Sequence, residues 1–396
     1  DNSGGATTTA DHNTAVGASA LLVNSTGASN TAVGKSALAA NTTGSYNIAV
    51  GKDALLSNTT ASYNISIGED SMDANTTGAN NVAVGYQALT ANTTANNNTA
   101  VGYNSAIANT TGAGNSALGE SSLKANTTGD NNVGIGKNAL EANTTAGSNT
   151  AIGKDALKAN IDGAENSAVG AEALDANTTG AENVAIGYGA LSANTTANYN
   201  TSVGKSSMGS NETGASNTAV GKSSGAAITT GDNNLCLGKD AGIASSPGGA
   251  VTTGDNQICL GDENITHAHI QVDWTVASDG RDKTDISELN SGLSFVNQLK
   301  PVTYRWDKRS HYSKDQDITP DGKYKSEQLD VGFLAQDVNE LEKNYGFSVE
   351  EKSNLISSLS NDGKMYGLKY NKFVPMLVNA VQELSAEIEK LKKEQN

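Results

Sequence analysis

Hydrophobic and polar residues follow a pattern that returns every 17 residues through roughly the first two thirds of this 396-residue chain. The segment Asn13-Thr14-Ala15-Val16-Gly17 recurs as residues 30–34, 47–51, 64–68 and 81–85, and stays in step as far as residues 217–221. Its alternation predicts a short β-strand, with side chains of the Val16 type directed inward. The glycine that follows suits a backbone that needs a positive φ or a close approach.

The rest of each repeat carries one leucine and then an Asn-Thr-Thr-Gly turn, as in residues 35–44. A fixed period of this size is typical of solenoid-like arrays, in which each unit buries its apolar side against its neighbours. About fifteen coils stacked ~4.8 Å apart would form a shaft roughly 70 Å long. The sequence therefore predicts a mainly β fold that begins with a repetitive β-solenoid or β-roll.

The large apolar side chains of one coil amount to one Val or Ile and one Leu. A single chain would then bury little apolar area, whereas three chains around a common axis would share one core. We therefore predict a homotrimer. Because the repeats are nearly identical, a slip of one chain by 17 residues would keep nearly every contact, so the array barely specifies its own register.

The composition changes near residue 266, and all four Phe lie beyond that point. We expect a shaft over residues 1–265, a junction over 266–277 that includes Trp274, and an α+β domain over 278–396. In the last region Val374, Leu377 and Val381 begin a series with alternating spacings of three and four, which continues with Leu384, Ile388 and Leu391. This series predicts a short coiled coil that would align the chains. The alternative is a single amphipathic helix packed on its own domain.

The net charge of the chain is −16, and residues up to Ala277 contain 22 acidic against 9 basic side chains. Such a surface repels the phosphates of nucleic acids and anionic membranes, so we expect no nucleic-acid partner. No apolar run reaches the ~18 residues that a membrane helix needs, and residues 1–5 carry no basic or apolar signal segment. We therefore expect no insertion into a membrane.

Several motifs beyond the repeats occur in a characteristic order. They are Ser278-Asp279-Gly280-Arg281-Asp282-Lys283, then residues 299–306 (LKPVTYRW), residues 331–338 (VGFLAQDV) and the helical tail from Tyr370 to Leu391. This order resembles the S74 intramolecular chaperone peptidases, over roughly residues 278–395. That family forms the C-terminal ends of phage endosialidase tailspikes, long tail fibres and neck appendages, and a relative occurs in a eukaryotic membrane-bound transcription factor. Asp282 stands where the family commonly has an apolar residue.

The resemblance implies a single-turnover autoprotease with a Ser–Lys pair. Ser278 would attack the carbonyl carbon of Ala277, Lys283 would act as general base, and the chain would be cut between Ala277 and Ser278. Asp279 and Arg281 would shape the loop through an ion pair. A lysine serves as a base in its neutral form, which burial favours, so trimer assembly would time the cleavage.

The resemblance also implies a location outside the host cell, in a trimeric phage tail fibre or appendage that attaches to a host-surface glycan or protein receptor. The repeats are similar in architecture to the heads of trimeric autotransporter adhesins, so a bacterial surface adhesin is an alternative. A polysaccharide-degrading spike is another, although Asp and Glu are dispersed over variable repeat positions and no pair of carboxylates stands out for glycoside cleavage. No cofactor is expected.

Two pairs of residues suggest metal or redox chemistry. His267 and His269 would point to the same side of a strand, and a trimer would gather six imidazoles around its axis as an octahedral metal site. We favour half-exposed strand residues and expect no metal. Cys236 and Cys259 occupy the same place in successive repeats, where they would serve as small buried filler rather than as a disulfide.

Two further groups have both a structural and a functional interpretation. The repeated Asn-Thr-Thr matches the N-glycosylation sequon, but Asn also forms turns, because it tolerates left-handed φ values and bonds its own backbone. We favour the turn. Tyrosines are the aromatic residues of the repeats and could stack on sugars, although scattered surface tyrosines need no function; they are Tyr46, Tyr63, Tyr86, Tyr103, Tyr188 and Tyr199.

Overall fold

A computed structural model describes residues 9–271, 275–313, 318–360 and 363–395. The first eight residues of the expected shaft, and residues 272–274 of the expected junction with Trp274, lie outside this range. The chain forms two compact units. The shaft unit comprises Asp1–Ile243 and Val251–Leu260, and the C-terminal unit comprises Ala244–Ala250 and Gly261–Asn396.

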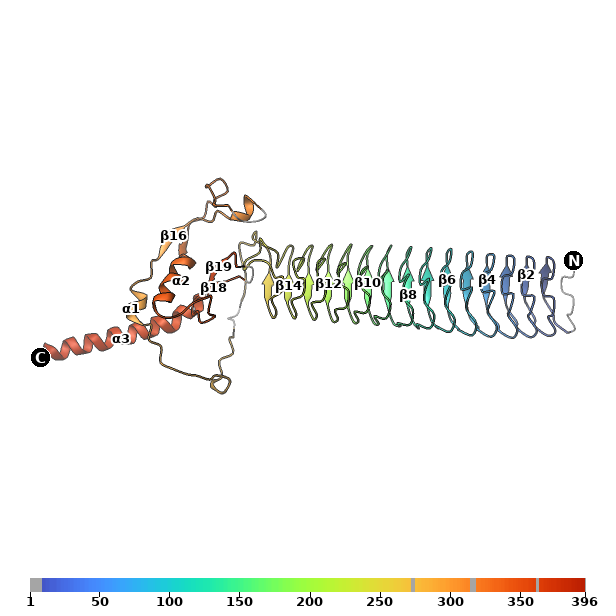
Figure 1. The fold of residues 1–396 in the computed structure, drawn as a ribbon, viewed down its shortest axis with the longest axis horizontal. Coiled ribbons are helices and arrows are strands. Elements are labelled where there is room, and N and C mark those ends of the chain that lie inside the picture. Colours follow the sequence, from blue (N-terminus) through green and yellow to red (C-terminus); the bar gives the residue numbers. More distant parts are fainter. Residues whose placement is uncertain (1–8, 272–274, 314–317, 361–362, 396) are drawn as a thin grey trace. The chain divides into compact units, whose positions relative to one another are not determined.

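The shaft unit is a parallel β-solenoid, as the repeat predicts. Among the described residues it contains one 15-stranded sheet in which each strand pairs with the next along the chain (Figure 1). Partner residues are 17 positions apart from β1 to β14 and 23 apart between β14 and β15, for example Thr14 with Thr31 and Leu235 with Ile258. The strands are β1 Thr14–Val16, β2 Thr31–Val33, β3 Ile48–Val50, β4 Ile65–Ile67, β5 Val82–Val84, β6 Thr99–Val101, β7 Ser116–Leu118, β8 Val133–Ile135, β9 Thr150–Ile152, β10 Ser167–Val169, β11 Val184–Ile186, β12 Thr201–Val203, β13 Thr218–Val220, β14 Leu235–Leu237 and β15 Ile258–Leu260.

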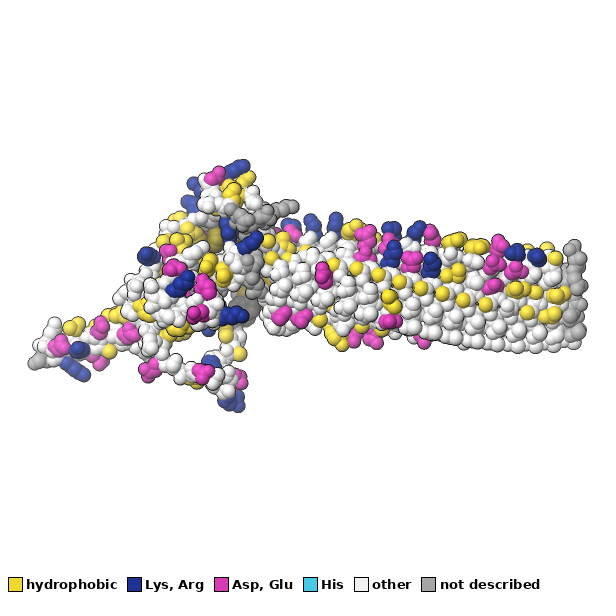
Figure 2. Space-filling model, viewed as in Figure 1, with side chains coloured by type: hydrophobic (Ala, Val, Ile, Leu, Met, Phe, Trp, Pro, Cys, Tyr) yellow, Lys and Arg dark blue, Asp and Glu magenta, His cyan; other side chains and the backbone are white. Residues whose placement is uncertain are grey.

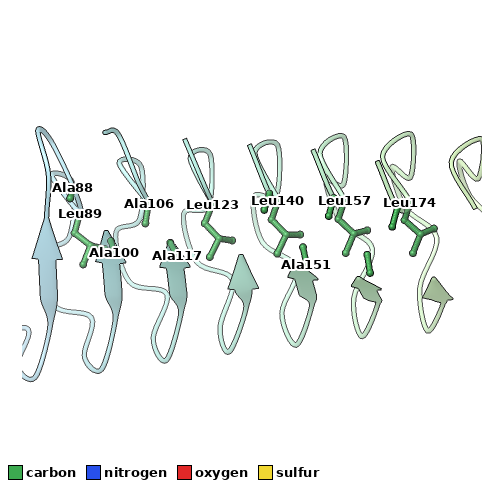
Figure 3. Close-up of a cluster of buried hydrophobic side chains, with 14 of the residues drawn as sticks. Ala88, Leu89, Ala100, Ala106, Ala117, Leu123, Leu140, Ala151, Leu157 and Leu174 are labelled. Atoms are coloured by element: carbon green, nitrogen blue, oxygen red, sulfur yellow. The ribbon is translucent and has the colours of Figure 1, made fainter. Parts of the chain in front are cut away.

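The middle residue of each strand is small and faces inward. Ala32, Ala49 and Ala151 are fully buried, whereas Val16 is 57% exposed. The expectation that residues of the Val16 type point inward is therefore wrong. The coil is too narrow for two large side chains, and the leucine of the following turn fills the space opposite the alanine, as Figure 3 shows for successive coils.

The leucines complete a core within one chain. Leu38, Leu140 and Leu157 are 0% exposed, although their backbones adopt the left-handed conformation with φ near +50°. That conformation is costly for a branched residue, and it persists because the tight turn is held by neighbours on both sides. The argument that one chain cannot bury its leucines is consequently wrong, and a trimer needs a different physical basis.

Two ladders of buried asparagines also hold the coils together. In the turn ladder, the Asn41 Nδ2 donates to Asn24 Oδ1 at 2.8 Å in the preceding coil and to the Gly44 carbonyl at 2.9 Å. In the strand ladder, the backbone N–H of Asn47 donates to Asn30 Oδ1 at 2.9 Å. Amide groups that would be costly to bury alone thus satisfy one another from coil to coil.

The glycine after each strand is required by both conformation and space. Gly153 has a φ of +137°, and a Cβ at this position would lie 2.5 Å from the carbonyl carbon of Gly170 in the next coil. Both reasons expected from the sequence therefore apply at this position.

The C-terminal unit is built from short elements around a small aromatic core. Phe295, Val338, Ile356, Phe373 and Met376 are buried at its centre. The elements are η1 Gly280–Asp282, α1 Leu293–Val296, β16 Val302–Tyr304, η2 Arg309–His311, β17 Asp330–Gly332, α2 Ala335–Asn344, β18 Ser357–Leu359, β19 Tyr366–Leu368, η3 Tyr370–Lys372 and α3 Phe373–Glu394. Antiparallel pairs join β16 to β17 and β18 to β19.

A buried carboxylate fixes α2 against the β18 strand. Glu342 is 0% exposed, and its oxygens accept the backbone N–H groups of Leu355 at 2.8 Å and Ser357 at 3.0 Å. The Ile356 N–H also donates to this carboxylate, at 2.5 Å. The sequence contains a signal for this role, because Glu342 follows Val338 by four residues and so lies on the apolar face of the helix.

Candidate functional site

The Ser278–Lys283 segment is organised by a single turn of 3-10 helix. Asp279 caps the turn η1, and its carboxylate accepts the backbone N–H of Arg281 at 2.9 Å. The same carboxylate binds the Arg281 guanidinium, with Nη2 to Oδ2 at 2.6 Å and Nε to Oδ1 at 3.1 Å. These contacts to Arg281 hold the pKa of the Asp279 carboxyl below its usual range. The ion pair expected between the two residues is present.

The turn η1 brings the side chains of Ser278 and Lys283, which flank it, into contact. The Lys283 Nζ lies 2.6 Å from Ser278 Oγ and 3.2 Å from the Ser278 carbonyl oxygen. A base within hydrogen-bond distance of a hydroxyl can accept its proton, which is the geometry that a serine nucleophile requires. A spacing of five residues does not by itself bring these two side chains into contact; the capped turn does.

The site is open to solvent within a single chain. Ala277, Ser278 and Lys283 are all exposed. A lysine acts as a base in its neutral form, which burial favours. The described residues of one chain leave Lys283 exposed, so a role as general base would require burial by another chain or molecule.

His267 and His269 lie in an exposed segment that is not a β-strand. Their rings nevertheless stack, with centroids 5.8 Å apart and an angle of 5° between planes, so the two side chains share one side as expected. The Thr266 hydroxyl lies 2.8 Å from His267 Nδ1. No group of three or more His, Cys, Asp or Glu suited to a metal ion occurs among the residues that the structure describes.

Cys236 and Cys259 face each other in register on β14 and β15, and both are free thiols. Cys236 is fully buried and Cys259 is half-buried. A hydrogen bond to Cys259, together with burial, raises the pKa of the Cys236 thiol. Their expected position, stacked coil on coil, is confirmed.

The sequon asparagines belong to the buried turn ladder, and each is at most 1% exposed. The turn interpretation is supported, because these amides are hydrogen-bonded inside the folded shaft. Contrary to the expectation from the sequence, the asparagine itself is not left-handed; its side chain instead bonds the carbonyl three residues ahead, as Asn41 does. The residues are Asn41, Asn58, Asn75, Asn92, Asn109, Asn126, Asn143, Asn177 and Asn194.

The shaft tyrosines are largely exposed and several stack on one another. Tyr46 and Tyr63 have ring centroids 5.1 Å apart, and Tyr86 and Tyr103 have centroids 5.5 Å apart. Each pair comes from adjacent coils at one repeat position. The stacking therefore follows from the repeat, and by itself indicates no ligand.

The outer face of the 15-stranded sheet carries an apolar ladder, formed by the last residue of each strand. In a single chain these side chains are exposed or half-buried. A continuous apolar strip of this length is uncommon on the surface of a monomer. The members are Val16, Val33, Val50, Ile67, Val84, Val101, Leu118, Ile135, Ile152, Val169, Ile186, Val203, Val220, Leu237 and Leu260.

Helix α3 carries two apolar stripes. Phe373, Met376 and Ala380 are buried against the C-terminal unit. The heptad series is uncovered, with Val374 58% and Val381 62% exposed, and Leu377, Leu384, Ile388 and Leu391 exposed as well. The helix therefore packs on its own unit, as the alternative interpretation expects, but through a different set of residues from the predicted coiled-coil seam.

Comparison with known proteins identifies the C-terminal segment. Residues 278–347 match the family model Peptidase S74, described as the chaperone of endosialidase. The resemblance that the motifs indicate is therefore confirmed for this segment, and the match begins at Ser278. A search of curated proteins and of solved structures found no match to the chain. Within the described residues, no helix is long and apolar enough to cross a membrane.

Proposed function

We propose that this chain is the subunit of a homotrimeric phage tail fibre or appendage that attaches to the host surface. Its C-terminal unit would align three chains and then be released by self-cleavage between Ala277 and Ser278. The observation that carries the proposal is the coincidence of two facts. The chaperone-of-endosialidase match begins at Ser278, and the Ser278 hydroxyl contacts the Lys283 amine at 2.6 Å.

The cleavage chemistry balances within these residues and one water. Ser278 Oγ bonds to the carbonyl carbon of Ala277 while Lys283 takes the hydroxyl proton. The Ala277–Ser278 C–N bond then breaks, and the proton passes to the leaving α-amine of Ser278. Water hydrolyses the resulting ester, which leaves Ala277 as a new C-terminus and Ser278 as a new N-terminus. Each molecule reacts once.

Two uncovered apolar surfaces support a trimer. The apolar ladder runs along the shaft unit, and the heptad seam runs along α3 in the C-terminal unit. Alternating spacings of three and four residues are typical of helices that pack on copies of themselves. Burial of both surfaces between copies would remove a large apolar area from water, at about 25 cal/mol per Å².

The repeats explain why the shaft would need the C-terminal unit to set the register between chains. Coils 17 residues apart are nearly equivalent, so three shafts can pack in several offsets with similar energy. The C-terminal unit has no such repetition and would select one alignment. After cleavage, the aligned shafts would be kinetically trapped, since the unit that set their register is gone.

Cleavage can be tested by denaturing electrophoresis and intact-mass measurement on the full chain beside Ser278→Ala and Lys283→Ala. We expect two fragments that end at Ala277 and begin at Ser278 in the wild type, and one intact chain in both variants. Lys390→Ala, an exposed lysine on α3, is the control and should be cut like the wild type. Intact wild-type protein would contradict the autoprotease and leave the C-terminal unit as a permanent trimeriser.

Assembly can be tested separately by light scattering on Ser278→Ala, which keeps the chain whole. We expect the mass of three chains, and a loss of that mass in Leu377→Lys/Leu384→Lys, whose side chains are exposed in one chain. Gln382→Lys/Ala386→Lys is the matched control, because it adds the same charge at exposed positions of the same helix outside the seam. A monomer in the parent protein would contradict the trimer.

A further inference from the structure

The basic residues of the shaft are gathered in one row. Seven of the nine lysines before Ala277 occupy the position directly after the glycine that ends each strand segment. In-register pairing of the strands places these positions above one another along the shaft. Figure 2 shows Lys and Arg side chains spaced along one edge of the shaft. A row of this kind is unexpected in a chain whose net charge is −16.

Three lysines in the earlier part of this row, which begins with Lys35, pair with acidic neighbours. Lys52 Nζ lies 3.0 Å from Glu69 Oε1, and Lys137 Nζ lies 3.0 Å from Glu120 Oε1. Lys154 Nζ lies 2.6 Å from Asp155 Oδ2. Each of these three lysines contributes to an ion pair between or within coils, so these three present little free positive charge.

The last part of the row is only partly paired. Lys205, Lys222 and Lys239 follow one another in three successive coils, and all three are exposed. Lys239 pairs with Asp240 at 2.8 Å, and the Lys205 ammonium lies over the Tyr188 ring, 5.6 Å from its centroid. Lys222 has no ion-pair partner among the described residues. Like charges at the same position of adjacent coils, about 4.8 Å apart, repel one another, so this arrangement costs the shaft stability.

We propose that Lys205, Lys222 and Lys239, with Tyr188 at one end, bind an anionic polysaccharide that lies along the shaft. The proposal rests on the proposed role in host attachment and names the chemistry of the receptor. Three ammonium groups in a line match a linear polymer with carboxylate or sulfate groups at intervals. Tyr188 is 51% exposed, and the part of its ring that Lys205 does not cover offers an apolar surface for a sugar.

The surroundings favour a polysaccharide over a nucleic acid. A DNA duplex carries one charge per ~1.7 Å of its length and would be repelled by the acidic remainder of the shaft. A polysaccharide with one anionic group per sugar or per disaccharide has a lower charge density. In a trimer the three rows would lie away from the axis, because rows of like charge repel, and the fibre would offer three equivalent sites.

The test measures binding of the full chain to immobilised heparin and polygalacturonate, which carry sulfate and carboxylate groups respectively. Neutral dextran and a DNA duplex serve as the other arms. The variant Lys205→Gln/Lys222→Gln/Lys239→Gln is compared with Lys52→Gln/Lys137→Gln/Lys154→Gln, which changes the same charge in the same row. We expect about a tenfold or greater loss of affinity for at least one polysaccharide in the first variant, and less than about a threefold loss in the second.

Four results would overturn the proposal: no binding of wild-type protein to either polysaccharide, binding retained in the first variant, equal losses in both variants, or a duplex bound as tightly as the polysaccharides. The two polysaccharides distinguish sulfate from carboxylate recognition. Cleavage and trimer mass are measured on the same samples. Wild-type protein that assembles and cleaves but binds neither polysaccharide would overturn this site and leave the proposed fibre standing. Wild-type protein that binds a polysaccharide without assembling would contradict the fibre and leave the site standing.

Discussion

The shaft and the C-terminal unit differ in how far their contacts specify a single alignment of the chain. In the shaft, the stabilising contacts recur from coil to coil, and many join residues 17 positions apart, as in the asparagine ladders. In the C-terminal unit, contacts join distant and unrelated positions, such as the backbone N–H of Leu293 with Glu383 Oε2 at 2.7 Å, 90 residues along the chain. A repeated contact stabilises many alignments equally, whereas a unique contact selects one. This difference explains why a repetitive fibre would need a non-repetitive partner.

The two cores differ in the same sense. The shaft core is made of Ala, Leu and Asn in a regular order, so each coil resembles the next. The C-terminal core is made of unlike residues, among them Phe295, Ile356 and Met376, around the buried Glu342. We therefore expect the shaft to be sensitive to backbone spacing between coils and the C-terminal unit to be sensitive to single side chains.

The largest effect should come from the shaft glycines. Gly153→Ala would place a Cβ 2.5 Å from the Gly170 backbone at a φ of +137°, so we expect a loss of about 3 kcal/mol or more, or failure to fold. Gly209→Ala is the matched control, because its Cβ would meet its nearest neighbour at 3.4 Å. Thermal unfolding followed by circular dichroism measures both. Equal stability of the two variants would show that spacing between coils is not limiting.

The asparagine ladder should give the next largest effect. Asn143 Nδ2 donates to Asn126 Oδ1 at 2.9 Å, and Asn143 Oδ1 accepts from Asn160 at 2.9 Å. Asn143→Ala would remove the donor to the buried Asn126 Oδ1 and one of the two acceptors of Asn160 Nδ2, which keeps the Gly163 carbonyl, with an expected cost of about 2–3 kcal/mol. Asn96→Ala is the control, since this exposed position is alanine in the neighbouring coils as Ala79 and Ala113. A similar loss of unfolding free energy in both variants would contradict a stabilising role for the asparagine ladder.

A substitution of Glu342 should lower the stability of the C-terminal unit alone. Glu342→Gln would turn an amide NH2 toward backbone N–H donors, and we expect a cost of about 1–2 kcal/mol. Differential scanning calorimetry should show the transition of the C-terminal unit at a lower temperature and the shaft transition unchanged. Glu340→Gln, exposed on the same helix, should leave both transitions in place. A shift of both transitions after Glu342→Gln would show that the units unfold together.

The smallest effect concerns pH. Burial, and then the nearby Asp70, raise the pKa of Asp73, whose Oδ1 is buried without a hydrogen-bond partner. Because the folded state holds this proton more tightly than the unfolded state, the stability contributed by protonation is lost as pH rises from about 4 through the raised pKa. Asp73→Ser, the residue of the equivalent position Ser192, should reduce this loss. This loss of stability is measured as the change in unfolding temperature between pH 3.5 and 7, with Asp162→Ser as the control. An unchanged pH dependence would contradict the role of Asp73.

The sequence alone determined the parts of this protein that depend on pattern. The 17-residue period fixed the solenoid, the short strands and the glycine positions, because a repeated local conformation requires repeated residues. The ordered motifs after Ser278 indicated the chaperone family. The pairing of Asp279 with Arg281 followed from the same motif.

Only the tertiary structure decided which side chains each coil encloses. The sequence shows Ala32 and Val33 as neighbours of similar character, and the size of the coil interior selects the smaller one. The same dimensions bury the leucines at positive φ and the asparagines in ladders, and they leave the valines outside, where packing between copies can use them. The contact between Ser278 and Lys283 likewise depends on the capped turn, because spacing along a chain does not fix the distance between two flexible side chains.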